Sequence, residues 1–356
     1  MTNDKSAKIE TKGLNAQAMA WIIGQKLHNG QYTIEKTLGK AGFGITYLAT
    51  DAQGNKLVIK TLNEDRLKQL TPVRRESLKC KFVDEARRLE GCKHPHVVKV
   101  YKTFVEGQWF CLAMEYIRGR NLGNLSQRVL PEKEALSYIQ QMGEALIAAH
   151  QQGLLHRNVK PANIMVRASQ YEAVLIDFDL GGKFEYPLIL GWQEEAFAPI
   201  ELKSKTRSHG TCTDVYSLAA TLYVLLTGKL PATSSDRQKG KADLIPPKQI
   251  NPQISKRVNK AILAGMKLEP EARPKSVLDW LKLLGVQRGG VISGLAKPPR
   301  WAMVVGILGV VGIAAGVVSA SIEGMGFWEK FIPESSPNVN PSVSSPLYLK
   351  SPETEE

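Results

Sequence analysis

Two short stretches of the chain carry residue types that suit a metal ion and a phosphate. The first is His156-Arg157-Asn158-Val159-Lys160-Pro161-Ala162-Asn163, and the second is Asp177-Phe178-Asp179. Hard divalent cations such as Mg²⁺ prefer carboxylate and amide oxygens, which Asp177 and Asn163 can supply. The ammonium of Lys160 is a point charge that suits phosphate oxygens. The two stretches therefore indicate a site for a metal–phosphate complex.

A glycine-rich turn and a strand that ends in a lysine lie upstream. The turn is Gly39-Lys40-Ala41-Gly42-Phe43-Gly44, and the strand is Leu57-Val58-Ile59-Lys60. Backbone N–H groups can approach phosphate oxygens closely where no side chain intervenes. Taken singly, the two features have simpler explanations: a glycine hairpin without a ligand and a solvated lysine at a strand edge. Their value lies in their position ahead of the first two stretches.

In this order the stretches resemble the eukaryotic-type serine/threonine protein kinases, in their bacterial style. The catalytic loop of that family reads H-R-D-x-K-P-x-N, and its metal-binding strand leads into D-F-G. This chain departs from the pattern at two positions. Asn158 replaces the aspartate that accepts the proton of the substrate hydroxyl, and Asp179 replaces the glycine. A third departure is Ala41, which replaces the middle glycine of the G-x-G-x-x-G loop.

The resemblance implies a site for ATP and Mg²⁺. Lys60 would face the α- and β-phosphates and pair with Glu85 of a helix around residues 82–89, and Lys160 would lie against the γ-phosphate. Asn163 and Asp177 would hold the metal. The catalytic positions are Asn158 and Lys160. The implied ATP-binding residues are Gly39, Ala41, Gly42, Phe43, Gly44, Thr46, Val58, Lys60, Glu85, Met114 (the gatekeeper), Glu115 and Ile117 (whose backbone meets the adenine), Asn121 (near the ribose) and Met165.

The same resemblance predicts an α+β fold with two lobes over residues 30–286. The first lobe, 30–117, would be a β-sheet with the helix that carries Glu85, and the second, 122–286, would be mainly helical. Apolar residues at helical spacing predict a helix over 131–152 that Gly153 ends. In the family's pattern, Asp214 would accept hydrogen bonds from the catalytic-loop backbone and Glu201 would pair with Arg273. Residues 1–29 would be an extension, in which residues 16–27 could form a short helix.

Composition limits the classes of protein to which the chain can belong. With 43% hydrophobic and 23% charged residues, it can bury a sizeable core. The net charge is +13, and only two of the basic residues lie beyond residue 300, against six acidic ones. This balance suits an anionic membrane surface or an acidic partner. We expect no nucleic-acid partner, because no recognition motif accompanies the charge. The four cysteines are scattered without C-x-x-C pairs and residues 1–10 show no signal peptide, which favours a reduced, cytoplasmic domain.

Residues 301–322 form an uncharged apolar run after a basic linker, 287–300. As a helix this run is about 33 Å long, enough for one bilayer span, although a buried core helix is the alternative. Lys297 and Arg300 precede it and Glu323 follows it, so the kinase-like domain should be cytoplasmic and the protein single-pass. Gly312 and Gly316 form a G-x-x-x-G step that could support a homodimer. Residues 323–356, rich in Pro, Ser and Glu, are expected to be a disordered tail.

The departures at positions 158 and 194 leave two hypotheses about function. Asparagine cannot accept a proton near neutral pH, and losing a general base costs roughly 10²- to 10⁴-fold in rate. Glu194 falls where these kinases carry a threonine. We favour a membrane-tethered pseudokinase that binds ATP·Mg²⁺, in which Glu194 pairs with Lys160 and the domain acts as a signalling scaffold for a protein partner. The alternative is an active serine/threonine kinase, slow or not, in which Glu194 or Asp179 supplies the carboxylate.

Two further points concern the nucleotide and its control. A third possibility is that nucleotide does not bind, because Ala41 and Asp179 distort the cleft. Between residues 177 and 201 the chain contains no serine or threonine, so Tyr186 is the only hydroxyl there that could be phosphorylated.

Overall fold

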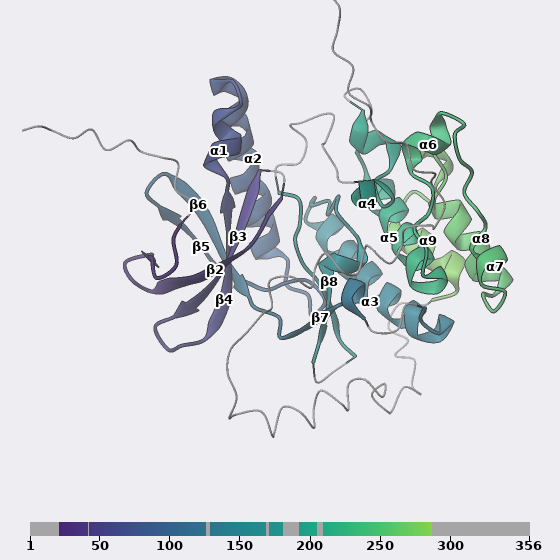
Figure 1. Cartoon of the computed structure of the whole chain (residues 1–356), viewed down its shortest axis with the longest axis horizontal. Helices are drawn as coiled ribbons and strands as arrows, with labels where there is room; N and C mark the ends of the chain where they lie inside the picture. Colours follow the sequence, from purple (N-terminus) through teal and green to yellow (C-terminus); the bar gives the residue numbers. More distant parts are fainter. Residues whose placement is uncertain are drawn as a thin grey trace, which may run out of the picture.

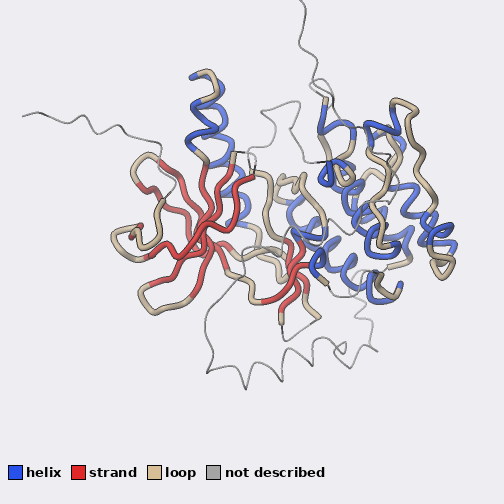
Figure 2. The backbone as a smooth tube through the Cα atoms, viewed as in Figure 1, coloured by secondary structure: helices blue, strands red, loops and turns tan. Residues whose placement is uncertain are grey.

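The computed structural model describes residues 21–286, apart from residues 42, 126–128, 169–170, 181–191 and 205–208. The described part has two lobes, one built mainly from strands and one mainly from helices (Figures 1 and 2). The predicted two-lobed α+β fold is therefore confirmed. Among the described residues, no helix is both long enough and apolar enough to cross a bilayer. The predicted span at 301–322, with Gly312 and Gly316, lies outside the described residues, as do Gly42 and Tyr186.

The first lobe is a six-stranded antiparallel sheet in the order β1-β2-β3-β4-β6-β5, with two helices. Its elements are β1 (Lys26–Leu27), β2 (Tyr32–Ala41), β3 (Gly44–Asp51), β4 (Lys56–Leu62), α1 (Glu64–Lys68), α2 (Pro72–Gly91), β5 (Val100–Glu106) and β6 (Trp109–Glu115). The expected short helix over 16–27 is wrong at its C-terminal end, because Lys26 and Leu27 pair with β2. Residues 16–20 lie outside the described part.

The alternation of side chains along β4 separates a packed face from an open one. Leu57 and Ile59 are buried in a small core on one face, together with Ile45 and Tyr47 of β3. Because successive residues of a strand point to opposite faces, Val58 and Lys60 project to the other side. That side faces the second lobe, so the sheet directs Lys60 toward the gap between the lobes.

The second lobe packs around two long helices. Its elements are β7 (Gly119–Asn121), η1 (Leu122–Asn124), α3 (Glu132–Gln151), η2 (Pro161–Asn163), β8 (Ile164–Arg167), β9 (Ala173–Leu175), α4 (Trp192–Glu195), η3 (Ile200–Lys203), α5 (Thr211–Thr227), α6 (Ser234–Gln238), α7 (Pro247–Ile250), α8 (Lys256–Gly265), η4 (Pro270–Ala272) and α9 (Val277–Leu284). The strands β7, β8 and β9 form a small antiparallel sheet beside α3. The predicted helix over 131–152 is confirmed as α3, and Gly153 follows it with a φ of 67°, a conformation that glycine adopts without strain.

Helix α5 is the centre of the second lobe, and it is buried from Thr213 to Thr227. Its polar side chains are satisfied inside the lobe: Ser217 Oγ donates to Phe197 O at 2.8 Å and Thr221 Oγ1 donates to Ser217 O at 2.8 Å. The helix ends at Gly228, whose φ is 64°. A helix buried on all sides fixes the loops that pack against both of its ends.

The predicted pair between Glu201 and Arg273 is confirmed, and it joins η3 to the segment after η4. Arg273 forms two parallel bonds to the carboxylate, at 2.6 and 2.9 Å, and both side chains are fully buried. Thr213 Oγ1 also donates to Glu201 Oε1 at 3.0 Å. Removing one partner leaves an uncompensated charge in a dry site, which is costly even where the intact pair stabilises little.

We predict that Arg273→Ala lowers the free energy of unfolding by about 3–5 kcal/mol, because Glu201 is left buried and unpaired. Chemical denaturation of the full chain measures the loss. The matched control is Lys282→Ala, which removes an exposed pair with Asp279 and should cost less than about 1 kcal/mol. Equal losses in the two variants would contradict the role assigned to the buried pair.

Candidate functional site

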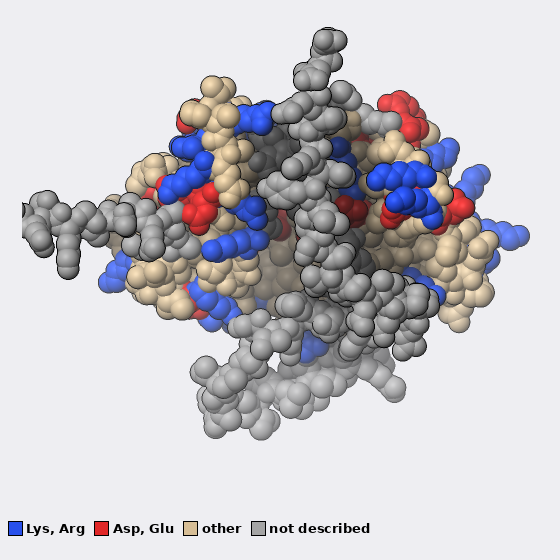
Figure 3. All heavy atoms as spheres, turned by 45° about the horizontal axis from the view of Figure 1, so that its top comes forward, with Lys and Arg blue, Asp and Glu red and all other residues tan. Residues whose placement is uncertain are grey.

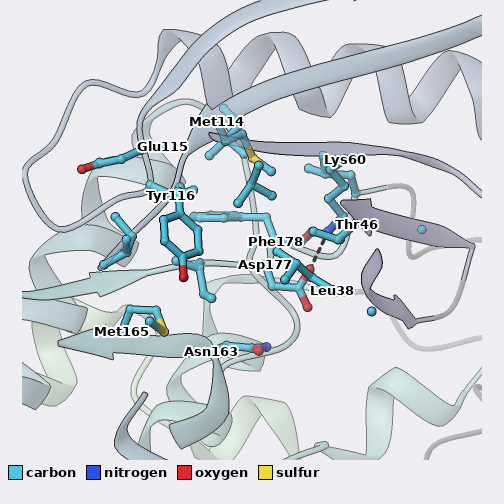
Figure 4. A pocket seen from close by; sticks show the side chains of 18 residues that line it. Leu38, Thr46, Lys60, Met114, Glu115, Tyr116, Asn163, Met165, Asp177 and Phe178 are labelled. Carbon is cyan, nitrogen blue, oxygen red and sulfur yellow. Dashed lines mark hydrogen bonds and ion pairs between the residues drawn. The ribbon is translucent and has the colours of Figure 1, made fainter. Parts of the chain in front are cut away.

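A cavity of about 300 Å³ lies between the two lobes. The strands β2, β3, β4 and β6 contribute one wall, and β8 with the segment after β9 contributes the other (Figure 4). The residues that line it are Leu38, Gly39, Gly44, Thr46, Val58, Lys60, Leu89, Val98, Met114, Glu115, Tyr116, Ile117, Asn163, Met165, Ile176, Asp177, Phe178 and Leu180. One end is apolar, and the other carries the charged and amide groups. This division matches a ligand with a flat apolar part and a polar tail.

Lys60 and Asp177 meet across the polar end of the cavity. Lys60 Nζ lies 2.7 Å from Asp177 Oδ1 and donates to Phe178 O, also at 2.7 Å (Figure 4). Thr46 is the cross-strand neighbour of Lys60 and lines the same end. Burial disfavours the Asp177 carboxylate, but the charge and hydrogen bond of Lys60 outweigh it and lower the pKa of Asp177. The aspartate is therefore ionised at neutral pH.

The predicted pairing of Glu85 with Lys60 is wrong for the described structure. Glu85 Oε1 instead accepts a hydrogen bond from Arg157 Nη1 at 2.9 Å. Arg157 has a φ of 59° and is itself nearly buried. The sequence identified both ion-pairing groups but could not decide between two cations that lie close together. The helix that carries Glu85, α2, is thus tied to the catalytic loop rather than to β4.

Two oxygen-bearing side chains at the polar end suit a hard cation. Asn163 Nδ2 donates to Asn158 O at 2.8 Å, which leaves the carboxamide oxygen of Asn163 as the atom that can face a metal. Asp177 adds a carboxylate. Within the described residues no cluster of three or more His, Cys, Asp or Glu side chains forms a protein cage for a metal. Such a set fits Mg²⁺, which takes one or two protein oxygens and completes its shell with phosphate and water.

Position 158 carries an amide that points toward the carboxylate of Asp177. Asn158 Nδ2 points at Asp177 Oδ2 from 3.5 Å. An aspartate in this conformation would bring two carboxylates to the same distance, whereas the amide makes a weak attractive contact. Asn158 is accommodated without strain, but it offers no group that can take a proton near neutral pH.

Lys160 lies just outside the cavity and is paired with Glu194 of α4. The contact joins Lys160 Nζ to Glu194 Oε1, and the lysine is 14% exposed while the glutamate is 41% exposed. The ion pair that the sequence predicted between these residues is present. This pair neutralises the charge of Lys160 from the side of α4.

Asp179 is tolerated where the related pattern has a glycine, because its φ is not positive. Burial raises the pKa of its carboxyl group, against the nearby charges of Lys60 and Arg157. The backbone oxygen of Asp179 accepts from Arg157 Nη1 at 3.4 Å. The cavity remains open beside it, so the residue does not close the cleft in this structure.

The segment that connects the lobes runs from Met114 to Ile117. Its Glu115 side chain forms a bidentate pair with Arg167 of β8, at 2.5 and 3.1 Å. This pair crosses from one lobe to the other, and Glu115 and Ile117 line the cavity at its apolar end. Backbone groups at such a position can bond to the edge of a flat heterocycle.

Comparisons with known proteins agree with this geometry. Residues 32–279 match the family described as "Protein kinase domain". This chain belongs to the protein kinase domain family. It is 30% identical over 296 residues to serine/threonine-protein kinase pkn2 of Myxococcus xanthus (76% of this chain, 34% of that protein). It is 31% identical over 265 residues to serine/threonine-protein kinase D of Synechocystis (69% of this chain, 50% of that protein).

Solved structures show the same fold. "PpkA-294 apo form" is 27% identical, with a TM-score of 0.58, over 74% of this chain and 99% of that one. The PknI kinase domain of Mycobacterium tuberculosis is 24% identical, with a TM-score of 0.57, over 75% of this chain and 99% of that one, and supports the fold alone. The chain thus contains a bacterial-style serine/threonine protein kinase domain. It spans only a third to a half of the curated relatives described above.

Most of the implied nucleotide-binding residues come together in this kinase domain, but not all of them line the cavity. Phe43, Glu85, Asn121, Asn158 and Lys160 are not among the lining residues, while Gly42 and the side chain of Ala41 lie outside the described part. Asn121 instead caps η1 by accepting from Asn124 N at 2.9 Å. The lining residues that sequence reasoning missed are Leu38, Leu89, Val98, Tyr116, Ile176, Phe178 and Leu180. All are apolar or aromatic, and from sequence alone they look like ordinary core positions.

One buried carboxylate accepts hydrogen bonds from the backbone of the catalytic loop, as predicted. Asp214, near the start of α5, accepts from His156 N at 2.9 Å and from Arg157 N at 2.8 Å. His150 Nε2 lies 2.7 Å from the same side chain. Burial opposes ionisation of Asp214, but its hydrogen bonds with His150 and with the backbone of His156 lower its pKa. A charged acceptor at this point fixes the backbone that leads to Asn158.

His156 is buried as a neutral ring. Asn158 N donates to its Nδ1 at 3.2 Å, and its Nε2 lies 2.9 Å from Ile176 O. Burial lowers the pKa of His156 from 6.5 to about 4, against the charge of Asp214, which favours protonation. A second proton on the ring would occupy the nitrogen that accepts from Asn158.

We predict that stability falls as the pH drops from about 6.5 to about 4. In this window the unfolded state binds a proton at His156 and the folded state does not, so the free energy of unfolding decreases by up to about 3 kcal/mol. Urea denaturation across this pH range measures the slope. In His156→Gln the slope should be shallower by about one proton, and equal slopes in the two proteins would contradict the assignment.

Proposed function

We propose that this kinase domain binds Mg²⁺·ATP in the cavity and transfers its γ-phosphate poorly, so that it acts as a membrane-anchored, nucleotide-dependent binding module for a protein partner. The observation that carries the proposal is the composition of the polar end. Lys60, Asn163 and Asp177 line one cavity, while position 158 beside them presents an amide. The groups that bind are present, and the group that would accept a proton is missing.

Nucleotide binding is supported by the order of groups along the cavity. The Glu115–Ile117 backbone suits an adenine edge, Val58 and Met165 form apolar walls, and Lys60 is placed for phosphate oxygens. Asp177 and Asn163 would hold Mg²⁺, which when bound neutralises phosphate charge. The alternative that nucleotide does not bind has less support, since Asp179 leaves the cavity open.

An active kinase, whether slow or not, is the second candidate, and the position of Glu194 favours it. This residue places a carboxylate against Lys160, two residues from Asn158. A carboxylate in that neighbourhood could accept the proton of a serine or threonine hydroxyl in place of the missing aspartate. The two candidates differ in how the rate responds to a change at position 158.

We predict a turnover of about 10⁻⁴ to 1 s⁻¹ with a general protein substrate, against roughly 1–100 s⁻¹ for the family. At saturating ATP, Asn158→Asp should raise the turnover by about 10²- to 10⁴-fold, because it restores a proton acceptor. Phosphate incorporation measured with the full chain, its Asn158→Asp variant and its Lys60→Met variant tests this.

Mg²⁺-dependent thermal stabilisation by millimolar ATP serves as the control for binding, and Lys60→Met should weaken it. A parent turnover in the family range that Asn158→Asp leaves unchanged would exclude impairment and favour the second candidate. Absence of any Mg²⁺·ATP stabilisation in the parent would exclude nucleotide binding.

Membrane anchoring is the other part of the proposal, and charge supports it. Lys and Arg side chains form patches on the visible face of both lobes, beside patches of Asp and Glu (Figure 3). A basic domain next to an apolar segment suits the anionic inner surface of a membrane, where each exposed Lys or Arg adds about 1 kcal/mol. Residues 301–322 would supply the span and place the domain in the cytoplasm.

We predict that the full chain remains in the membrane pellet after an alkaline carbonate wash. Val310→Arg combined with Val311→Arg places two charges near the centre of the run, each costing about 2.5–3.5 kcal/mol there, and should release the protein. The matched control is Val310→Leu with Val311→Leu, which keeps the run apolar. A parent chain that the wash releases would contradict the proposed anchor.

A further inference from the structure

Lys160 stands at the far end of the path that a bound nucleotide would follow. The cavity begins at Met114–Ile117 and reaches Lys60, Asn163 and Asp177 at its polar end. Lys160 is not among the lining residues, yet its charge helps to lower the pKa of Asp177. Asn158, two residues before it, lies 3.5 Å from Asp177, so Lys160 lies near the polar end of the cavity. A nucleotide that already spans the cavity would present its last phosphate to this lysine.

Glu194 occupies that lysine in the described structure. The carboxylate contacts Lys160 Nζ directly, and the lysine keeps only 14% of its side-chain surface exposed. A third phosphate would add negative charge where a carboxylate already stands. It must either displace Glu194 or bind beside it, and both alternatives cost free energy that a diphosphate avoids.

Helix α4 holds Glu194 in place through contacts that do not involve the cavity. The next residue, Glu195, pairs with Lys203 at 3.1 Å. Phe197 is buried, and its backbone oxygen accepts from Ser217 Oγ of α5 at 2.8 Å. Ala198 O accepts from Ser234 Oγ at 2.8 Å. These contacts attach the segment from α4 to Ala198 to the second lobe. The backbone that carries Glu194 is therefore held in place.

We propose that Glu194 sets the nucleotide preference of this site. By neutralising Lys160 it removes the cation that the third phosphate would meet, so the domain binds a Mg²⁺·nucleoside diphosphate at least as tightly as the triphosphate. This inference rests on the nucleotide binding proposed above. The inference adds that the domain prefers a nucleoside diphosphate in the cavity and that Glu194, a side chain outside the cavity, causes this preference.

The test is the ratio of two dissociation constants, measured by calorimetry with Mg²⁺·ADP and with a Mg²⁺ complex of an ATP analogue whose β- and γ-phosphorus atoms are bridged by an imido group. For the full chain, the diphosphate should bind as tightly as the triphosphate analogue or more tightly. Glu194→Gln should shift the ratio about 5-fold toward the triphosphate, the upper range for a partly exposed pair. The matched control is Glu76→Gln, which removes the same charge from an exposed position of α2 that pairs with Lys79 and should leave the ratio unchanged.

A second variant excludes an indirect effect on folding. Lys160→Met combined with Glu194→Gln removes the cation as well, and the gain in triphosphate binding should disappear. Thermal melting without ligand checks that each variant is folded. Equal shifts in Glu194→Gln and Glu76→Gln, or no shift in either, overturn the inference while nucleotide binding stands. If neither nucleotide binds the parent chain, the proposed function and this inference both fail.

Discussion

The arrangement of this site depends on how three cations share three carboxylates in the absence of a nucleotide. Lys60 pairs with Asp177, Arg157 with Glu85 and Lys160 with Glu194. Each cation that could meet a phosphate, and the acid that could meet a metal, is therefore already neutralised from within the chain. Under the proposed function, phosphate and Mg²⁺ would have to exchange these partners. Because partial burial strengthens each pair, the exchange would bear on which ligand binds.

The exchange reaches beyond the cavity because each pair belongs to a different element. The Asp177 pair joins β4 to the segment after β9, the Glu85 pair joins α2 to the catalytic loop, and the Glu194 pair joins α4 to that loop. If a metal drew Asp177 away from Lys60, the lysine would be free to attract Glu85, and α2 would follow. A partner that contacts α2 could then distinguish the occupied domain from the empty one without any phosphate being transferred.

Sequence alone predicted the parts of this structure that rest on strong local signals or on spacing. The periodicity of α3, the glycine that ends it, and the groups that hold the loops from below, Asp214 and the Glu201–Arg273 pair, are confirmed. The predicted partner of Glu85 was wrong, because two cations, Lys60 and Arg157, compete for its carboxylate. Which of them pairs with it depends on small differences in the position of α2. The apolar lining, such as Leu89 and Phe178, was missed because burial in a core and exposure to a cavity select the same residue types.

Asn158 replaces a repulsion between two acids with a weak attraction, and it offers no proton acceptor. Its amide lies 3.5 Å from Asp177, where an aspartate would add a second negative charge beside a carboxylate that pairs directly with Lys60. Such a pair of acids is tolerable when a metal stands between them and unfavourable when it does not. An asparagine carries no charge, so its contact with Asp177 does not depend on a metal between the two side chains. The same substitution removes the only group at position 158 that could take a proton, and the two consequences cannot be separated. Asparagine in place of aspartate suits a domain that only binds its ligand. It does not suit an enzyme that must turn over rapidly, because that enzyme needs the proton acceptor.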